Sequence, residues 1–321
     1  MGVTTGREWA AQQSSERRYK QTMTPTTTNL SAIPDVFDRQ LLLKRRGRAA
    51  ATLDAHSFLL ERVADDFSER LSAIHRRFAS GIDLGAHQGL LGRRLLSENA
   101  LDYLISIEPL AALLARCAGC CIQGDVTAIP VADAQADLAV SGLALHLVND
   151  LPGALIQIRR ILKPDGLFLG ALLGGATLTE LRAAFLEAET ECEGGASPRV
   201  APFADVRDLG GLLQRAGFAL PVVDNDVINV TYATPLHLMR ELRGMGATNM
   251  LTHRRRTFLR RQTLARACEI YAERFSNPDG RIRATFEIIT LTAWAPHPDQ
   301  PKPLKPGSAT TRLSDALGIK P

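Results

Sequence analysis

The sequence predicts an α/β protein with a doubly wound, mostly parallel sheet, and three observations support this fold class. Strand-like and helix-like stretches alternate for five cycles between residues 81 and 175, which is the pattern of a parallel sheet. The run after residue 135 is almost continuously apolar, as expected for a strand covered on both faces. The first strand ends in a glycine turn, and the second ends on an acid about twenty residues later.

The N-terminal part of the chain divides into two segments of different composition. Residues 1–32 are polar and rich in Thr, Ser and Gln, and we expect them to form a disordered leader. Over residues 33–80, apolar side chains recur three and four positions apart, which predicts a helical segment. We expect these helices to pack beside the first strand and to form a lid over a ligand site.

The stretch 81–92, GIDLGAHQGLLG, organises the core, which we expect to span residues 81–175. Gly85 can take a positive φ angle and has no Cβ, so backbone N–H groups there can approach a ligand closely. The second strand, 102–108, ends on Glu108, and the third, 120–125, ends on Asp125. Ligands of open α/β sheets bind at the carboxyl ends of the strands, where these acids are expected to lie.

The end of the core and the following segment are marked by helix breakers. A helix is predicted over 151–162, with Asp150 as its N-cap, and Lys163-Pro164-Asp165-Gly166 is expected to end it before the fifth strand. The additions over 176–295 include two strands that we expect to close the sheet as an antiparallel pair, and the Pro-rich tail is expected to be irregular. The predicted elements are helices over 178–191, 205–218, 235–244 and 257–275, strands over 222–232 and 284–294, a Gly/Pro-marked loop over 192–203, and the tail over 296–321.

Several of these motifs, DLGAHQG, IEP, GD and ILKPDG, together resemble the class I S-adenosylmethionine-dependent methyltransferases, which have a Rossmann-like fold. The resemblance implies S-adenosylmethionine as cofactor and an 81–295 methyltransferase-like domain. It places the methionine part of the cofactor on the strand-one turn, the ribose hydroxyls on the acid after strand two, and the adenine at the end of strand three. The implied cofactor-binding residues are Asp83, Gly85, His87, Gly89, Glu108, Asp125 and Val126.

A closer resemblance covers most of the chain. FDRQLLLKRR, SGLALHLVNDLP, AETECEGGASPRVAPF, RELRGMGATN and PGSAT resemble, in order, the methyltransferase-like assembly factors of respiratory complex I (NADH:ubiquinone oxidoreductase). That family is close to the biotin-pathway malonyl-acyl-carrier methyltransferases. The resemblance implies a role in assembling the peripheral arm, with an iron–sulfur subunit as protein partner. For the mitochondrial member it implies hydroxylation of an arginine on that subunit rather than methyl transfer.

Two positions depart from the family pattern. His87 stands where the family has the middle glycine of the turn, so its ring is expected to narrow the path of the cofactor's carboxypropyl chain. Leu147 stands where an aromatic residue often follows the histidine after strand four. Reduced cofactor affinity, or an adapted loop, is expected from the first departure, and loss of an aromatic substrate contact from the second.

The titratable residues of the predicted site allow functional and structural interpretations. His146, just after strand four, is the candidate base or substrate contact, or else it orients a loop. Asp83, inside an apolar strand, is expected to be hydrogen-bonded, most simply to loop amides. We predict no metal site, because His297 and Asp299 lack a further ligand, and because Cys117, Cys120 and Cys121 are expected to be core cysteines.

Composition limits the partners and the compartment. With 22% charged residues, a net charge of +4 and 5% aromatic residues, the chain lacks the features of a nucleic-acid-binding protein. The run 253–256, HRRR, with Arg260 and Arg261, fits an acidic partner subunit, an anionic membrane surface with peripheral contact, or a solvated helix face. No apolar run is long enough to span a bilayer. Glu8 and Glu16 favour a bacterial cytoplasmic protein over one imported into the mitochondrial matrix.

Three functional hypotheses follow from these patterns. The first is an S-adenosylmethionine-dependent methyltransferase acting on a protein or a small acceptor during complex I assembly. The second is an arginine hydroxylase on the same fold. The third, which His87 favours, is an assembly chaperone without catalysis.

Overall fold

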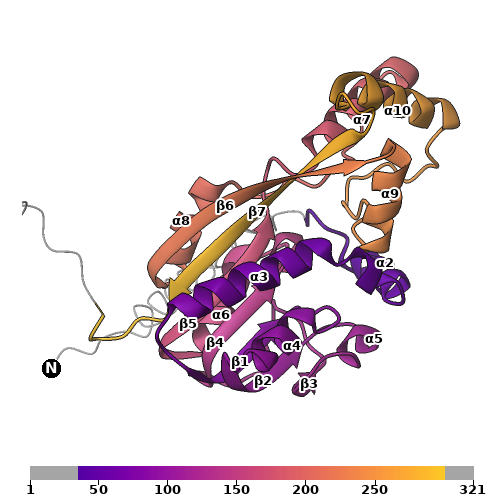
Figure 1. Ribbon diagram of the computed structural model, residues 1–321. Coiled ribbons are helices and arrows are strands. Elements are labelled where there is room, and N and C mark those ends of the chain that lie inside the picture. The colour runs from indigo at the N-terminus through magenta and orange to yellow at the C-terminus, as the bar shows by residue number, and fades with distance from the viewer. Residues whose placement is uncertain (1–34, 301–321) are drawn as a thin grey trace, which may run out of the picture. The chain divides into compact units, whose positions relative to one another are not determined.

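The computed structural model describes residues 35–300 and contains a seven-stranded sheet with the order β3-β2-β1-β4-β5-β7-β6 (Figure 1). The first five strands pair in parallel, and β7 runs antiparallel to both of its neighbours. The predicted fold class, a mostly parallel sheet closed by an antiparallel pair, is confirmed. The expected leader, 1–32, and residues 301–321 of the expected tail lie outside the described residues.

The predicted N-terminal helical segment contains α2 (Arg39–Ala49), the short 3₁₀ helix η1 (Leu53–His56) and α3 (Phe58–Ala73). Helix α2 begins at Asp38, whose carboxylate accepts a hydrogen bond from the Leu41 N–H at 3.0 Å. Helix α3 packs on the sheet because its apolar residues recur on one face. The buried residues of that face are Leu59, Leu60, Val63, Ala64, Phe67 and Leu71.

The core elements follow the predicted alternation. They are β1 (Phe78–Leu84), α4 (Leu90–Ser97), β2 (Leu101–Ile107), α5 (Ala111–Leu114), β3 (Cys120–Ile122), β4 (Ala136–Gly142), η2 (Leu145–Leu147), α6 (Leu151–Ile161) and β5 (Leu162–Leu173). The Asp150 carboxylate caps α6 by accepting from the Gly153 N–H at 2.8 Å, as predicted.

Two boundaries in the core differ from the prediction. Strand β3 ends at Ile122, so Asp125 lies in the loop after it rather than on its last residue. Residues 163–166 end helix α6, but they are already part of β5. Asp165 has a φ angle of 62°, and the pairing of β4 with β5 changes register nearby, between Ala136 and Leu138. The breaker residues therefore form an irregularity in a strand instead of a separate turn.

The C-terminal additions extend the sheet and carry four helices. They comprise α7 (Thr179–Glu193), α8 (Val206–Arg215), β6 (Ala219–Tyr232), α9 (Pro235–Gly244), α10 (Arg261–Phe275) and β7 (Ile282–Trp294). Helices α7 and α10 pack against each other at one end of the long β6–β7 pair (Figure 1). Within residues 35–300, no helix is both long and apolar enough to cross a membrane.

The sheet is buried on both faces by apolar side chains. One cluster joins α3 and α4 to the sheet and continues to α7, α9 and α10, with Phe67, Leu95, Leu104, Leu138 and Phe286 among its residues. The other joins α6 and α8 to the opposite face, with Ile82, Leu155, Phe168, Leu213 and Leu291 among its residues. This two-sided covering explains why the central strands are apolar along most of their length.

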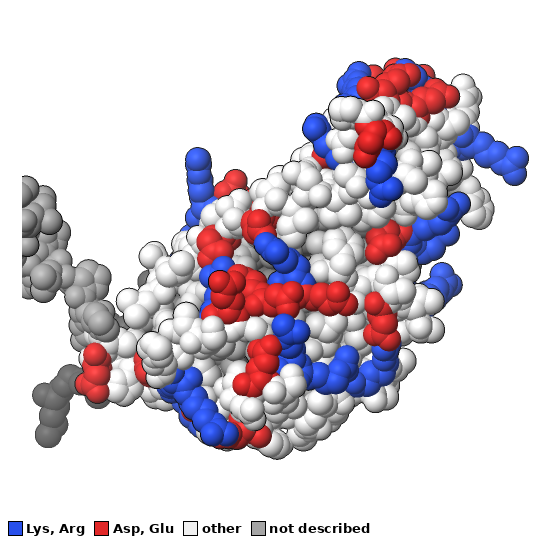
Figure 2. Space-filling model, in the orientation of Figure 1, with Lys and Arg blue, Asp and Glu red and all other residues white. Residues whose placement is uncertain are grey.

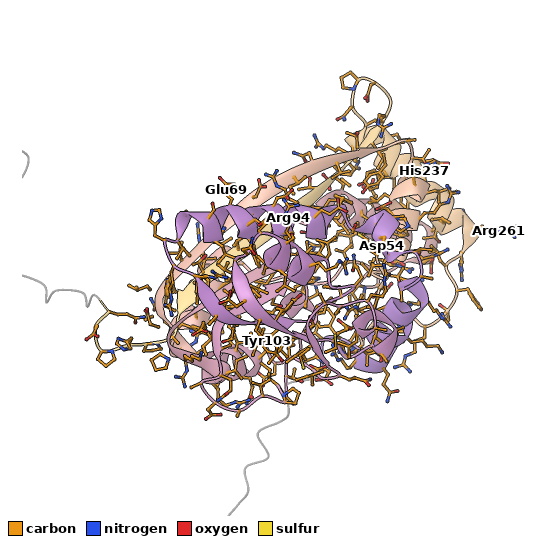
Figure 3. The ribbon with its side chains drawn as sticks, turned by 60° about the horizontal axis from the view of Figure 1, so that its bottom comes forward. Asp54, Glu69, Arg94, Tyr103, His237 and Arg261 are labelled. Atoms are coloured by element: carbon orange, nitrogen blue, oxygen red, sulfur yellow. The ribbon has the colours of Figure 1, made fainter. Side chains whose placement is uncertain are left out.

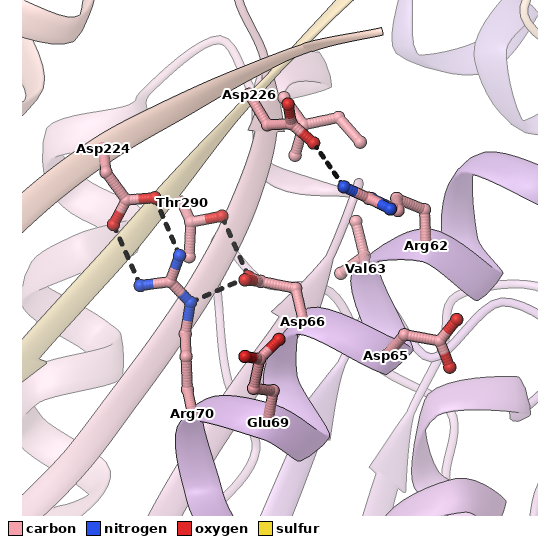
Figure 4. Close-up of a pocket in the computed structure, with 10 residues that line it drawn as sticks. Arg62, Val63, Asp65, Asp66, Glu69, Arg70, Asp224, Asp226 and Thr290 are labelled. Atoms are coloured by element: carbon pink, nitrogen blue, oxygen red, sulfur yellow. Dashed lines mark hydrogen bonds and ion pairs between the residues drawn. The ribbon is translucent and has the colours of Figure 1, made fainter. Parts of the chain in front are cut away.

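Ion pairs also connect helix α3 to the C-terminal strands. Acidic side chains form a band over α3, with arginines interspersed (Figure 2). In this band, Arg70 donates to Asp66 at 2.8 Å and binds Asp224 of β6 through both terminal nitrogens at 2.7 and 2.9 Å (Figure 4). Thr290 of β7 donates to Asp66 at 3.3 Å. The network connects segments that are far apart in the sequence.

We expect Arg70→Met to lower the free energy of unfolding by about 1–2 kcal/mol, because Arg70 makes two partly exposed ion pairs, each worth up to about 1 kcal/mol. Urea unfolding at low ionic strength measures the loss, which salt should reduce. The matched control is Arg77→Met, whose ion pair with Asp102 is more exposed and should contribute little. Equal effects of the two substitutions would contradict the role assigned to Arg70.

Candidate active site

The candidate site lies at the carboxyl ends of the parallel strands and begins with the turn after β1. Gly85 and Gly89 have φ angles of 68° and 74°, a region that glycine adopts at little cost. The Gly85 and Ala86 N–H groups donate to the Ile107 carbonyl at the end of β2. A Cβ atom on Gly85 would lie 2.5 Å from the Cβ of Ala144, so the turn approaches the segment after β4 too closely for a side chain.

His87 occupies the middle of this turn with a φ angle of 51°, a left-handed conformation that costs a non-glycine residue about 1–3 kcal/mol. Its Nδ1 accepts a hydrogen bond from Arg46 at 2.9 Å, so Nε2 carries the proton and donates to the Gly142 carbonyl at 2.9 Å. Burial, together with the charge of Arg46, lowers the pKa of His87 to about 3. A neutral imidazole thus connects the turn after β1 to the end of β4.

Glu108, directly after β2, is fully buried, and both of its carboxylate oxygens are bonded within the protein. One oxygen accepts from the Leu110 N–H at 3.2 Å. The other accepts from the His87 N–H and from Arg46 Nη2, both at 3.1 Å. The Arg46–Glu108 ion pair is therefore buried. Because Glu108 is not accessible to solvent, a ligand hydroxyl can reach it only if a neighbouring group such as Arg46 moves aside.

Asp125, in the loop after β3, has the same kind of arginine partner. One oxygen accepts from the Thr127 N–H and hydroxyl at 3.0 and 2.9 Å, and the other forms an ion pair with Arg39. Arg39 and Arg46 are seven residues apart, so they lie on one face of α2. Helix α2 thus contacts both predicted cofactor-binding acids.

The other two predicted cofactor-binding side chains are buried. Val126 packs in the apolar cluster beneath α6. Asp83 is 1% exposed, and its Oδ2 has no hydrogen-bond partner among residues 35–300. Burial, assisted by the nearby negative charge of Glu108, raises the pKa of Asp83 to about 7, although the Gly92 N–H opposes the shift. The amide that acts on this carboxylate thus belongs to helix α4 and not to the loop, which was expected from the sequence to supply it.

A cavity of about 100 Å³ adjoins the turn and is lined mainly by leucines, with a few polar groups. Gln88 is buried there, and neither its Oε1 nor its Nε2 has a partner among the described residues. His146 also lines the cavity, and its Nδ1 is likewise without a partner in that part of the chain. Burial, and then the charge of Arg46, lowers the pKa of His146 to about 3, so its imidazole is neutral near pH 7.

An aromatic ring reaches His146 from a distant part of the sequence. Phe203, at the end of the predicted loop 192–203, contacts His146 edge-on, with ring centroids 5.7 Å apart. The middle of the loop is anchored because Glu189 of α7 accepts from the Ser197 N–H at 2.6 Å and from Arg199 Nε at 2.8 Å. Leu147 indeed supplies no aromatic ring, but Phe203 places one beside the same histidine.

The residues present fit a nucleoside cofactor, provided that the arginines of α2 move. Carboxylates at neighbouring strand ends suit ribose hydroxyls and an adenine amine, while Gln88 and Asp83 Oδ2 offer polar atoms that have no partner within residues 35–300. The cavity is smaller than the roughly 300–1,000 Å³ of most small-molecule sites. A ligand of nucleoside size must therefore displace Arg46 from Glu108 and Arg39 from Asp125.

One further sequence prediction that the structure tests concerns the clustered cysteines. The interpretation of the clustered cysteines as core residues is wrong for Cys120 and Cys121, which are exposed on the short strand β3. Cys117 is partly buried, and burial raises its pKa to about 12. Within residues 35–300, no group of three or more His, Cys, Asp or Glu side chains is placed to hold a metal ion.

The basic run 253–261 is partly used inside the protein. Arg254 pairs with Asp38 at the start of α2, and Arg255 pairs with Glu193 at the end of α7. Arg261, in contrast, points away from the chain (Figure 3), and Phe258 is fully exposed. The run is thus divided between internal ion pairs and an exposed basic part.

Sequence reasoning missed Arg39, Arg46, Gln88 and Phe203 as parts of the site. Helix α2 carries five cationic residues, Arg39, Lys44, Arg45, Arg46 and Arg48, so the sequence does not reveal which of them face inward. The position of Phe203 depends on how a loop folds back on the sheet. Gln88 was the residue with the clearest signal, because it lies inside the glycine turn.

Comparisons with known proteins identify relatives of this chain. Residues 82–170 match the family model described as a methyltransferase domain. The chain is 38% identical to the human protein "Arginine-hydroxylase NDUFAF5, mitochondrial", with 96% of this chain and 92% of that protein covered. It is 34% identical to a "Malonyl-[acyl-carrier protein] O-methyltransferase" of Halorhodospira halophila, over 80% of this chain and 88% of that protein.

Among solved structures, the YcgJ protein of Bacillus subtilis has a similar fold. The TM-score is 0.50, with 72% of this chain and 97% of that chain covered. At 13% sequence identity, this likeness concerns the fold alone.

Proposed function

The chain belongs to the NDUFAF5 family of methyltransferase-fold proteins, and from this premise we propose that it binds S-adenosylmethionine and modifies a protein during assembly of respiratory complex I. One observation carries the proposal. Glu108 and Asp125 lie at neighbouring strand ends beside a glycine turn, where a nucleoside is bound in doubly wound folds. The proposed protein substrate is an iron–sulfur subunit of the peripheral arm.

We assign the following roles to residues of the site. Glu108 and Asp125 accept hydrogen bonds from the nucleoside, and the turn from Asp83 to Gly89 holds the amino-acid portion, with His87 narrowing its path. Val126 borders the adenine. Bound S-adenosylmethionine supplies an electrophilic methyl group, so the main work of the protein is to position an acceptor in line with it.

His146 is the proposed catalytic residue at the acceptor position. Its imidazole is neutral near pH 7, and its Nδ1, which has no partner among the described residues, can accept a proton from the attacking group. The leucine-rich wall of the cavity and the edge of Phe203 exclude water from the same position. We assign no metal to the reaction.

Hydroxylation of an arginine is the second candidate function, because the names of the human and Danio rerio relatives include that activity. It would add one oxygen atom to the partner subunit, whereas methyl transfer adds one CH₂ unit. A chaperone role without catalysis would add neither. For the compartment we propose the bacterial cytoplasm, with peripheral contact to the inner membrane through the exposed part of 253–261. The alternative is the mitochondrial matrix, because the names of the relatives assign those proteins to mitochondria.

Two measurements on the purified protein test the proposed function. Calorimetric titration with S-adenosylmethionine should give a dissociation constant in the micromolar range, and absence of binding would overturn the cofactor assignment. Intact-mass analysis of the iron–sulfur subunit then distinguishes the reactions. The subunit is incubated in air with the protein, S-adenosylmethionine and a two-electron reductant, because hydroxylation takes one oxygen atom from dioxygen and reduces the other to water. A gain of one CH₂ unit supports methyl transfer, a gain of one oxygen supports hydroxylation, and no gain supports a chaperone.

A further inference from the structure

The guanidinium of Arg46 enters the candidate site from α2 and uses only part of its hydrogen-bonding capacity. The side chain is buried and lines the cavity together with His87 and Gln88. Its Nη2 donates to Glu108 at 3.1 Å and to His87 at 2.9 Å. Among residues 35–300, its Nε and Nη1 have no hydrogen-bond partner. A guanidinium has five N–H donors in a rigid plane, so most of them remain available to an anion.

The position of Arg46 is fixed by close packing. Gly246, in the segment after α9, has a φ angle of 74° and lies directly against the arginine. A Cβ atom at Gly246 would be 3.1 Å from Arg46 Cα and 3.3 Å from Arg46 Cγ. Because the aliphatic stem is held in this way, the guanidinium can exchange partners by rotating its end while α2 stays close to the site.

Within the described part of the chain, Arg46 is also the only lysine or arginine that lines the cavity. The imidazoles of His87 and His146 beside it are neutral near pH 7, since burial and the charge of Arg46 lower both pKa values to about 3. The third histidine of the lining, His56, lies 3.0 Å from its own partner Glu241. A negatively charged group that enters from the glycine turn therefore meets Arg46 as the one arginine or lysine of this described lining. The carboxylate of Glu108 is the present partner of that cation, and it is also the predicted acceptor for ribose hydroxyls.

We propose that Arg46 binds the carboxylate of the cofactor's amino-acid portion, and that it exchanges Glu108 for this carboxylate as the nucleoside hydroxyls take over Glu108. The inference rests on the proposed function, because it concerns a ligand with a nucleoside at one end and an amino acid at the other. After the exchange, Arg46 is paired with the carboxylate of the ligand, and Glu108 is hydrogen-bonded to neutral hydroxyl groups, so neither buried charge is left without a partner. The ion pair between Arg46 and Glu108 is thus replaced by two contacts with the ligand.

The alternative is that Arg46 is solely a structural partner of Glu108. In that case its removal frees Glu108 and affects all nucleoside ligands alike. If Arg46 binds the carboxylate, its removal weakens only the ligands that carry one. S-adenosylhomocysteine and 5′-methylthioadenosine share the adenosine and the thioether sulfur, but the second lacks the amino acid, so this pair of ligands separates the two possibilities.

The experiment is calorimetric titration of the full chain with both ligands, for the wild type and for the Arg46→Met, Arg46→Lys and Arg48→Met variants. We expect the wild type to prefer S-adenosylhomocysteine, and Arg46→Met to reduce this preference by about tenfold to a hundredfold, as for loss of a hydrogen bond to a charged group. Arg46→Lys keeps the positive charge but lacks the planar guanidinium, so it should lose a smaller part of this preference than Arg46→Met. Arg48 is exposed on the same helix and has no ion pair or hydrogen bond among the described residues, so Arg48→Met should keep the full preference.

The possible results separate this inference from the proposed function. An unchanged preference in both Arg46 variants overturns the inference and leaves the proposed function standing. Failure of the wild type to bind either ligand overturns both. Thermal melting of each variant shows whether it is folded. If Arg46→Met does not fold, the ligand preference of Arg46→Lys decides whether Arg46 binds the carboxylate.

Discussion

Glu108→Gln is expected to lower the free energy of unfolding by about 3–5 kcal/mol, although the substitution changes only one atom. The reason is that Arg46 is buried and loses its counter-charge, while the amide keeps the size of the side chain. A buried cation without a partner is far more costly than a missing ion pair at the surface. Urea unfolding near neutral pH, followed by circular dichroism, measures the effect.

Two further variants define the origin of this loss. Arg46→Met combined with Glu108→Gln removes both charges and should recover most of the stability. Asp125→Asn breaks the partly exposed pair with Arg39 and should cost about 1 kcal/mol or less. If Glu108→Gln costs no more than Asp125→Asn, the buried pair does not have the role that its burial indicates.

The second large effect is a loss of stability in acid through His146. Its pKa is lowered from 6.5 to about 3, so between these values the unfolded chain binds a proton that the folded chain does not. The unfolding free energy should therefore fall as the pH decreases from about 6.5 toward 3. The full shift corresponds to about 5 kcal/mol. His87, with a similarly lowered pKa, should contribute in the same direction.

The wild-type profile alone cannot isolate this effect, because Asp83 acts in the opposite sense. Its raised pKa means that the folded protein gains a proton more readily between pH 7 and 4, which stabilises it as the pH falls. The measurement is therefore the difference between the wild type and His146→Gln, taken by urea unfolding from pH 7.5 to 4.5. As the pH falls, the free energy of unfolding of His146→Gln should rise relative to that of the wild type. His253→Gln, at an exposed histidine, is the control, and parallel profiles for wild type and His146→Gln would contradict the prediction.

The elements of the fold could be predicted because their local patterns agree with their surroundings. The central strand β4 is almost continuously apolar, and it is covered on both faces. The prediction was less accurate where tertiary pairing decides the boundary. Strand β3 lies at the edge of the described sheet and ends three residues early. The Pro-Asp-Gly sequence at 164–166 stays in β5 because β4 pairs with Leu162 and Leu167 on either side of it, and because Ala295, just after β7, bonds to Asp165 and Gly166.

In the candidate site, too, some residues could be predicted from the sequence and others could not. The positions of Glu108 and Asp125 follow from topology, since parallel neighbouring strands bring their carboxyl ends to one edge. The arginines that pair with these acids come from a helix with cations on several sides, so only the packing of α2 decides which of them are inside. Phe203 reaches His146 from 57 positions away in the sequence, and no local pattern encodes such a contact.

The contacts of α3 with β6 and β7 have a consequence for synthesis of the chain on the ribosome. Asp66 and its partner Thr290 are 224 residues apart, and at about 5–20 residues per second the second is made about 10–45 s after the first. During this interval α3 has emerged while β7, whose Thr290 and Ile288 border it, has yet to be made. The acidic residues Asp65, Asp66 and Glu69 of α3 then give the helix a negatively charged surface that favours contact with water over association with other nascent chains. Asp66, which joins α3 to β7 in the finished protein, thus also helps to keep the incomplete chain apart from others.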